Sequence, residues 1–85
     1  MKTPVKTKDL AWEKASNGYI LQDKESDKTF TLDPISFLVW MQCDGKTNLE
    51  TIVDIFSVNG NRDIIKAAIE GILEKLESNG LIKWV

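Results

Sequence analysis

Two helix starts separated by one tight turn constrain this chain more than any other feature of its sequence. Asp33 can cap a helix whose first residue is Pro34, because the proline ring sets a helical φ and its missing N–H needs no partner. Further along, Thr47 and Glu50 have the spacing of a capping box, in which each side chain accepts from the other residue's amide. Asp44-Gly45 supplies the turn between them. The sequence therefore predicts two helices that meet at a sharp angle.

Helical periodicity continues to the C-terminal part of the chain, and the expected helices span residues 34–43, 48–57 and 61–78. Asn61 is the expected N-cap of the third helix, and Asn79-Gly80 ends it, since glycine accepts the left-handed conformation common just past a helix. The apolar positions expected to face the core are Ile35, Leu38, Val39, Trp40, Leu49, Ile52, Val53, Phe56, Ile64, Ile65, Ala68, Ile69, Ile72, Leu73 and Leu76.

The residues before Pro34 alternate with a period of two, which predicts strands at about residues 9–15, 19–23 and 28–32. Asn17-Gly18 is a strong signal for a two-residue hairpin, and residues 23–27 form a charged loop. The last five residues, 81–85, read as a short extended tail. Within it, Trp84 has three open interpretations: packing on the sheet, a dimer contact, or a loose end.

These elements predict an α+β fold, in which an N-terminal three-stranded antiparallel β-meander precedes three α-helices, as in a winged helix-turn-helix. At 85 residues the chain forms one domain, residues 1–85, with a small core. A hydrophobic fraction of 42% and a charged fraction of 28% are typical of an ordinary soluble globular protein. No apolar run approaches the roughly 18 residues of a membrane span, so we expect a cytoplasmic protein without a membrane partner.

The residue inventory argues against an enzyme. The chain has no histidine and one cysteine, Cys43, which is expected to behave as a small buried hydrophobe. No base stands beside a nucleophile and no glycine-rich phosphate loop is present, so we expect no catalytic residue, metal or cofactor.

Charge argues against nucleic acid as the partner. The net charge is −2, and residues 62–77 of the third helix carry three basic and four acidic side chains. A recognition helix with a net charge of −1 would be repelled by phosphate, so DNA binding is the weaker interpretation of a winged helix.

Several short motifs together resemble a known family. They are Val5, Ala11-Trp12, Tyr19-Ile20-Leu21, Phe30-Thr31-Leu32-Asp33-Pro34, Trp40, Asp44-Gly45-Lys46-Thr47, Glu50-Thr51-Ile52 and Asn79-Gly80-Leu81-Ile82. In this order and spacing, over about residues 5–82, the chain resembles the PqqD family, small proteins named for pyrroloquinoline quinone synthesis and also known as RiPP recognition elements. Two departures are Asp33, where the family usually has asparagine, and Phe37, near which it favours small residues.

The resemblance implies a non-catalytic peptide chaperone. In that family the leader of a ribosomally synthesised precursor peptide pairs with the third strand and lies in the groove beside the third helix. The leader is presented to a separate modifying enzyme, often a radical SAM enzyme. The alternative is a winged-helix module that binds another protein or DNA, and the chain could act as a monomer or a homodimer.

Strand addition requires an edge whose N–H and C=O groups are unpaired, and the expected edge is residues 28–32. On the facing helix, four apolar residues are candidates for the groove wall: Ile65, Ile69, Ile72 and Leu73. Arg62 and Lys66 could meet acidic leader residues at its end. The peptide-binding residues implied in this way are Lys28, Thr29, Phe30, Thr31, Leu32, Arg62, Ile65, Lys66, Ile69 and Leu73.

Each assignment has a structural alternative. A stripe of isoleucine and leucine at helical spacing is more often core than ligand wall. Lys28 could instead guard an exposed edge against aggregation, and Arg62 and Lys66 could be solvated surface residues.

Overall fold

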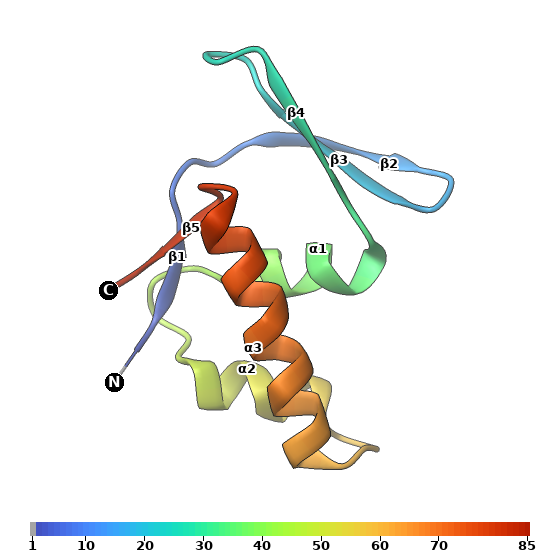
Figure 1. The fold of residues 1–85 in the computed structure, drawn as a ribbon, viewed down its shortest axis with the longest axis vertical. Coiled ribbons are helices and arrows are strands. Elements are labelled where there is room, and N and C mark those ends of the chain that lie inside the picture. Colours follow the sequence, from blue (N-terminus) through green and yellow to red (C-terminus); the bar gives the residue numbers. More distant parts are fainter. Residues whose placement is uncertain (1) are drawn as a thin grey trace.

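The protein is described by a computed structural model that covers residues 2–85 (Figure 1). The elements, in chain order, are β1 (Pro4–Lys6), β2 (Ala11–Ala15), β3 (Gly18–Asp23), β4 (Lys28–Leu32), α1 (Pro34–Met41), α2 (Leu49–Phe56), α3 (Arg62–Ser78) and β5 (Ile82–Trp84). The predicted α+β class is confirmed: an antiparallel sheet of β2, β3 and β4 precedes three helices. This order is compatible with a winged helix. None of the helices in this part of the chain combines the length and the apolar character needed to cross a membrane.

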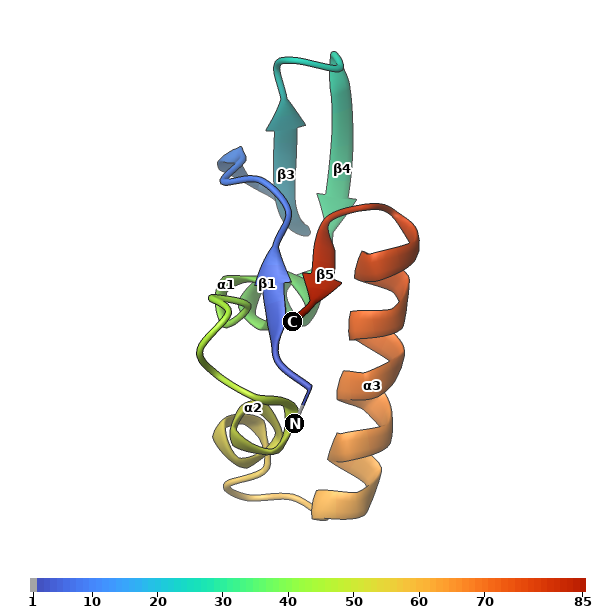
Figure 2. The same ribbon diagram turned by 90° about the vertical axis from the view of Figure 1, so that its left-hand side faces the viewer.

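A second, two-stranded sheet joins the two ends of the chain. It was not predicted from the sequence. β1 and β5 pair antiparallel, with Val5 opposite Lys83, so the termini lie side by side (Figures 1 and 2). Val5 also bridges to Asp44, and the Gly45 amide donates to the Pro4 carbonyl at 3.0 Å. Strands of three residues show too little alternation to be predicted, because their pairing partner lies at the other end of the sequence.

Helix α1 begins as predicted but buries a different face. The Asp33 carboxylate accepts from the Ser36 amide, and Pro34 occupies the first turn. The buried residues are Phe37, Val39 and Trp40, whereas Ile35 and Leu38 are exposed, so their expected place in the core is wrong. All but one of the side chains in α1 are apolar, so periodicity does not indicate which face turns inward.

Aromatic stacking decides which face of α1 is covered. Phe37 lies face to face with Tyr19 of β3, with ring centroids 3.8 Å apart and planes 8° apart. The half-exposed Trp12 of β2 meets Phe37 edge-on at 4.8 Å. The bulk of Phe37 is therefore accommodated by the aromatic side chains of the sheet.

The capping box predicted at the start of α2 does not form. Asn48 is the N-cap, and its side chain accepts from the Thr51 amide at 3.0 Å. The Thr47 hydroxyl and amide both donate to the Asp44 carboxylate, which also accepts from the Lys46 amide. Because this turn holds Thr47, the helix begins one residue later than predicted.

Helix α3 has the predicted ends. The Asn61 side chain accepts from the amides of Asp63 and Ile64. At the other end the Leu81 amide donates to the Leu76 carbonyl and the Gly80 amide to the Glu77 carbonyl, with Gly80 at φ +73°. These two bonds form a Schellman motif. Two positions expected in the core, Ile64 and Ala68, are exposed instead. The buried face of α3 is narrower than the face formed by all of its apolar residues.

The hairpin between β2 and β3 forms, but its turn is displaced from the predicted dipeptide. Ala15 pairs with Gly18, so Ser16 and Asn17 make the turn and Gly18 is the first residue of β3. Positive φ occurs in residues 2–85 at Asp27, Gly45 and Gly80, not at Gly18. A Cβ atom on Gly18 would lie 2.2 Å from the Leu32 carbonyl oxygen. Glycine is therefore required there for close approach to the end of β4.

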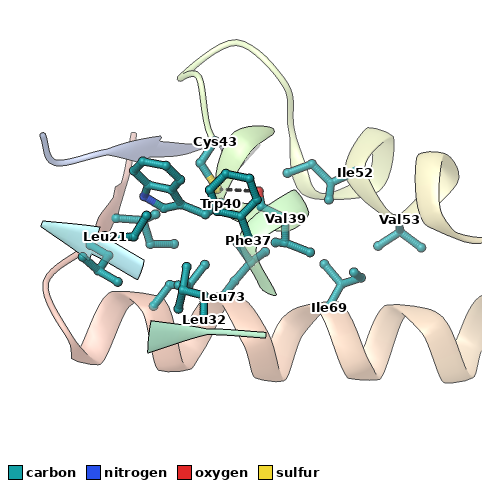
Figure 3. Packing of buried hydrophobic residues seen from close by; sticks show 13 residues of the cluster. Leu21, Leu32, Phe37, Val39, Trp40, Cys43, Ile52, Val53, Ile69 and Leu73 are labelled. Atoms are coloured by element: carbon teal, nitrogen blue, oxygen red, sulfur yellow. Dashed lines mark hydrogen bonds between the residues drawn. The ribbon is translucent and has the colours of Figure 1, made fainter. Parts of the chain in front are cut away.

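The core lies where the three helices meet the inner face of the sheet (Figure 3). Its buried hydrophobic members are Leu21, Leu32, Phe37, Val39, Trp40, Cys43, Ile52, Val53, Ile69, Leu73, Leu76, Leu81 and Ile82. The Cys43 thiol donates to the Val39 carbonyl at 3.3 Å, and burial raises its pKa to about 12. The thiol therefore stays protonated near neutral pH and acts as a packing group, as expected from the sequence.

Candidate functional site

Strand β4 is an edge of the three-stranded sheet. The strand order is β2-β3-β4, so β4 pairs with β3 on one side only. The register places Phe30 opposite Leu21 and Leu32 opposite Tyr19. One side of β4 is therefore free to accept another strand.

The register also decides which backbone groups of β4 face outward. Ala15 and Gly18 are partners across a two-residue turn, which is possible only for a hydrogen-bonded pair. Because hydrogen-bonded and non-bonded pairs alternate, Ile20 also bonds to β2, and Leu21 bonds to Phe30 of β4. The remaining β4 residues then present their N–H and C=O groups to the free edge.

Those remaining residues are Thr29 and Thr31, both of which are exposed. Apart from the β3–β4 ladder, neither residue makes a hydrogen bond to any other residue between 2 and 85. Each therefore offers one donor and one acceptor to an incoming strand. The predicted edge is confirmed as a structural feature.

A hollow of about 260 Å³ separates this edge from the C-terminal half of α3. Its lining residues are Thr29, Phe30, Thr31, Leu32, Asp33, Ser36, Ile72, Lys75, Leu76 and Asn79. A second hollow of about 220 Å³ shares Phe30 and Asn79 with it and continues to Lys28. We call the two hollows together the groove. In Figure 2, β4 runs down toward the C-terminal end of α3.

The groove has an apolar floor and a polar rim. Phe30 and Ile72 are half-buried and pack against the core, with the buried Leu32 and Leu76 beside them. On the rim, the Asp33 carboxylate is occupied by the Ser36 amide and hydroxyl, at 2.8 and 3.1 Å. Lys75 is exposed and forms no ion pair with any residue in the described part of the chain. The floor suits an apolar side chain, and the rim carries a lysine that has no ion-pair partner.

A polar cluster lies beside the second hollow, which Lys8 and Asp23 line. The Lys8 ammonium lies 3.1 Å from both the Asp23 and the Glu25 carboxylates. Its pKa is raised by the hydrogen bonds to Glu25 and then Asp23, while the pKa of Asp23 is lowered, chiefly by its hydrogen bond with Ser26. Lys8 therefore fixes the segment before β2 to the β3–β4 turn.

Comparison of the sequence with known protein families shows which family the chain belongs to. The sequence profile of the family described as Coenzyme PQQ synthesis protein D (PqqD) matches residues 18–82. The chain belongs to the PqqD family. No curated protein and no solved structure matches it in the same comparisons. PqqD proteins are non-catalytic accessory proteins of PQQ biosynthesis, of the RiPP-recognition type, that bind a precursor peptide and act with a modifying enzyme.

The structure brings only part of the predicted PqqD-type site together. Thr29, Phe30, Thr31 and Leu32 line the hollow beside α3, and Lys28 lines its continuation. The helix residues lie elsewhere. Ile69 and Leu73 are core residues with exposures of 2% and 0%, and Ile65 packs at the core margin without lining the groove. These helix assignments for peptide contact remain predictions from sequence.

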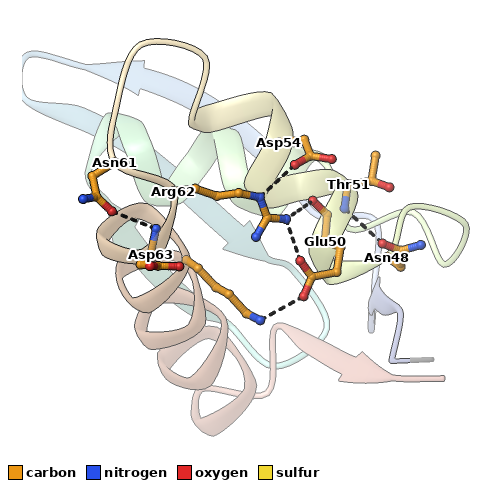
Figure 4. A network of polar contacts seen from close by, with 8 residues as sticks. Asn48, Glu50, Thr51, Asp54, Asn61, Arg62 and Asp63 are labelled. Atoms are coloured by element: carbon orange, nitrogen blue, oxygen red, sulfur yellow. Dashed lines mark hydrogen bonds and ion pairs between the residues drawn. The ribbon is translucent and has the colours of Figure 1, made fainter.

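Arg62 and Lys66 are at the opposite end of α3, where they hold α2 (Figure 4). Arg62 donates to the Asp54 carboxylate at 3.1 Å and to the Glu50 carboxylate, and the Lys66 ammonium lies 2.9 Å from Glu50. The pKa of Glu50 is lowered, first by its hydrogen bond with Arg62 and then by that with Lys66. Glu50, which was expected to close a capping box, therefore joins two helices instead.

Four residues of the groove rim were not among the peptide-binding residues predicted from the sequence: Asp33, Ser36, Lys75 and Asn79. The sequence did indicate Ile72 as a wall candidate, and Ile72 lines the groove. The apolar stripe of α3 repeats along its length, so the sequence does not indicate which half of the helix meets β4. The helix end at Gly80 is the sequence signal that could have identified this half, because the turn there places Asn79 and Leu81 close to β4.

Proposed function

We propose that this PqqD-family chain binds the leader of a ribosomally synthesised precursor peptide by adding it as a strand to β4. The observation that supports this function is the outward-facing backbone of Thr29 and Thr31 beside the groove. By family resemblance, the partner that receives the peptide is a radical SAM enzyme. The chain itself contributes binding and positioning and no catalytic group.

Main-chain pairing supplies affinity that depends little on the leader's side chains. Each hydrogen bond to Thr29 or Thr31 contributes about 0.5–1.5 kcal/mol net, because the same groups bond to water in the free protein. Selectivity comes from alternate side chains of the bound strand, which point toward Phe30 and Ile72. Sequence selection is therefore expected at every second position of the leader.

The proposed catalytic benefit is proximity. Holding the leader raises the effective concentration of the rest of the peptide at the enzyme that modifies it. The modification rate should then depend on this chain at low peptide concentration and become independent of it when the peptide is in large excess.

The first test is an amide-resolved NMR titration with synthetic leader segments from short peptides encoded beside the gene. Binding should shift the amides of residues 29–32 and 72–79 saturably, because these residues form the edge and the facing wall. Shifts confined to other surfaces, or a response to duplex DNA alone, would contradict the proposal and favour the winged-helix alternative.

A matched pair of variants tests the edge itself. Thr31→Pro removes an outward N–H without breaking the β3–β4 ladder, so it should lower leader affinity about tenfold or more, whereas Thr31→Val should leave affinity nearly unchanged. Unchanged chemical shifts in β3 would show that the proline variant is folded. Equal affinities for the two variants would exclude strand addition at this position.

A further inference from the structure

We infer that the groove selects a leader with a carboxylate side chain, which Lys75 binds, two residues away from an apolar side chain that sits on Phe30 and Ile72. This inference rests on the proposed strand addition and adds to it the chemistry of the peptide that is recognised. It assigns to Lys75 a role in specificity.

Lys75 forms no ion pair with any other residue between 2 and 85. The two other basic residues of α3, Arg62 and Lys66, both have carboxylate partners on α2. Lys75 has none among residues 2–85. Asp33 is the one acidic residue that lines the same hollow, and its carboxylate accepts hydrogen bonds from the Ser36 amide and hydroxyl and forms no ion pair with Lys75. A carboxylate of a bound peptide would give Lys75 an ion-pair partner.

The neighbours of Lys75 on the helix surface keep it free. Positions three and four residues away, the ones a helical side chain can reach, are Gly71, Ile72, Ser78 and Asn79, and none is acidic. The acidic residues Glu70, Glu74 and Glu77 line a different hollow, beside Trp84 and Lys2. The acidic side of α3 therefore faces away from the groove.

The strand geometry fixes the spacing between the two recognised side chains. A peptide paired with β4 presents every second side chain to the same face as Phe30. One such side chain meets the exposed parts of Phe30 and Ile72, and the next on that face, two residues along, is within the reach of a lysine on the adjacent helical turn. The recognised pattern is thus a carboxylate and an apolar residue separated by one residue.

A display selection tests this pattern without knowledge of the natural leader. Random 12-residue peptides would be selected on the wild-type chain, on Lys75→Glu and on Lys83→Glu. Lys83 is an exposed lysine of β5 outside the groove, so its reversal makes the same change in net charge. Peptides from wild type and Lys83→Glu should be enriched in Asp or Glu two positions from Leu, Ile, Val or Phe. Peptides from Lys75→Glu should lose the acid and gain Lys or Arg.

A charge swap then measures the contact. A wild-type-selected peptide should bind Lys75→Glu about tenfold more weakly, and replacing its carboxylate by lysine should restore binding to that variant. Lys75→Gln provides a second variant, because glutamate near the C-terminal end of a helix is itself unfavourable. It should lose the preference for acid without acquiring one for base.

The outcomes distinguish a failure of the Lys75 contact from a failure of strand addition to β4. If the selected peptides bind Thr31→Pro as tightly as wild type, or if no peptide is enriched, strand addition is wrong and the inference fails with it. If binding is weakened by Thr31→Pro but the acidic preference persists on Lys75→Glu and Lys75→Gln, strand addition stands and the role of Lys75 is overturned.

Discussion

The two ends of helix α3 differ in what their polar groups do. At the N-terminal end, Arg62 and Lys66 are bound to carboxylates of α2, so their charges are satisfied within the fold. At the C-terminal end, Lys75 and Asn79 line a groove beside an unpaired strand. The difference teaches that a basic residue on a binding module is informative only after its internal partners are known.

The apolar residues of the helix show the same division. Ile64, near the N-terminal end, is 67% exposed, whereas Leu73 and Leu76 in the other half are buried beneath the groove. The N-terminal half places Ile65 and Ile69 against the core and joins α2 through the ion pairs of Arg62 and Lys66. The C-terminal half forms both the core and the wall of the proposed site.

The largest expected effect comes from two isoleucines of this helix. Ile69→Ala should lower the free energy of unfolding by about 2–5 kcal/mol, because Ile69 is 2% exposed and its loss leaves a cavity. Ile64→Ala removes the same atoms from an exposed side chain and should change the free energy of unfolding by about 0.5 kcal/mol or less. Urea denaturation of both variants measures the difference, and similar losses would mean that Ile64 is covered in solution.

An element of this fold could be predicted where its signal lies within a short stretch of the sequence. Strands β2, β3 and β4 and all three helices follow from alternation, caps and glycine breaks within the sequence, since these signals are local. The buried face of α1 was not predictable, because Ile35 and Phe37 look equally apolar until Tyr19 is seen to stack on Phe37. The pairing of β1 with β5 depends on two segments at opposite ends of the chain.

The site was predictable to a smaller extent. The edge strand followed from the meander, but its outward residues follow only from the observed hairpin register, because the turn lies one residue before the predicted dipeptide. The groove's helical wall could not be predicted, because α3 repeats the same apolar spacing over 17 residues and either half would satisfy it. Glu50 illustrates the competing signal, since the same carboxylate suits a capping box and an ion pair with Arg62.

A smaller effect distinguishes the two glycines in the C-terminal half of α3 and its cap. Gly80→Ala should cost about 1–2 kcal/mol of stability, because φ of +73° disfavours any residue with a Cβ even though nothing crowds that position. Gly71→Ala lies inside the helix, meets no atom within 4 Å, and should stabilise by about 0.5–1 kcal/mol. Thermal unfolding compares them, and a Gly80→Ala variant at least as stable as wild type would refute the Schellman cap.

Acid should weaken the N-terminal end of α3 specifically. The pKa of Glu50 in the folded protein lies below its ordinary value of 4.5 because Arg62 and Lys66 favour the carboxylate. Its contribution to stability is therefore full above that value and is lost as pH falls through the lowered pKa. Glu50→Gln removes this dependence, so the stability gap between wild type and variant should shrink from pH 7 to pH 3. A gap that stays constant would show that the ion pairs do not form in solution.

The smallest expected effect is also the sharpest comparison of the two ends. Arg62→Gln should leave the affinity for a groove-binding peptide unchanged within about twofold, because Arg62 is bound to Glu50 and Asp54 away from β4. Lys75→Gln removes the same charge at the other end and should weaken the binding of an acidic peptide. Isothermal titration of one peptide against both variants measures the two effects side by side. A loss of affinity with Arg62→Gln that equals the loss with Lys75→Gln would return the acidic contact to the N-terminal end, as the sequence alone had suggested.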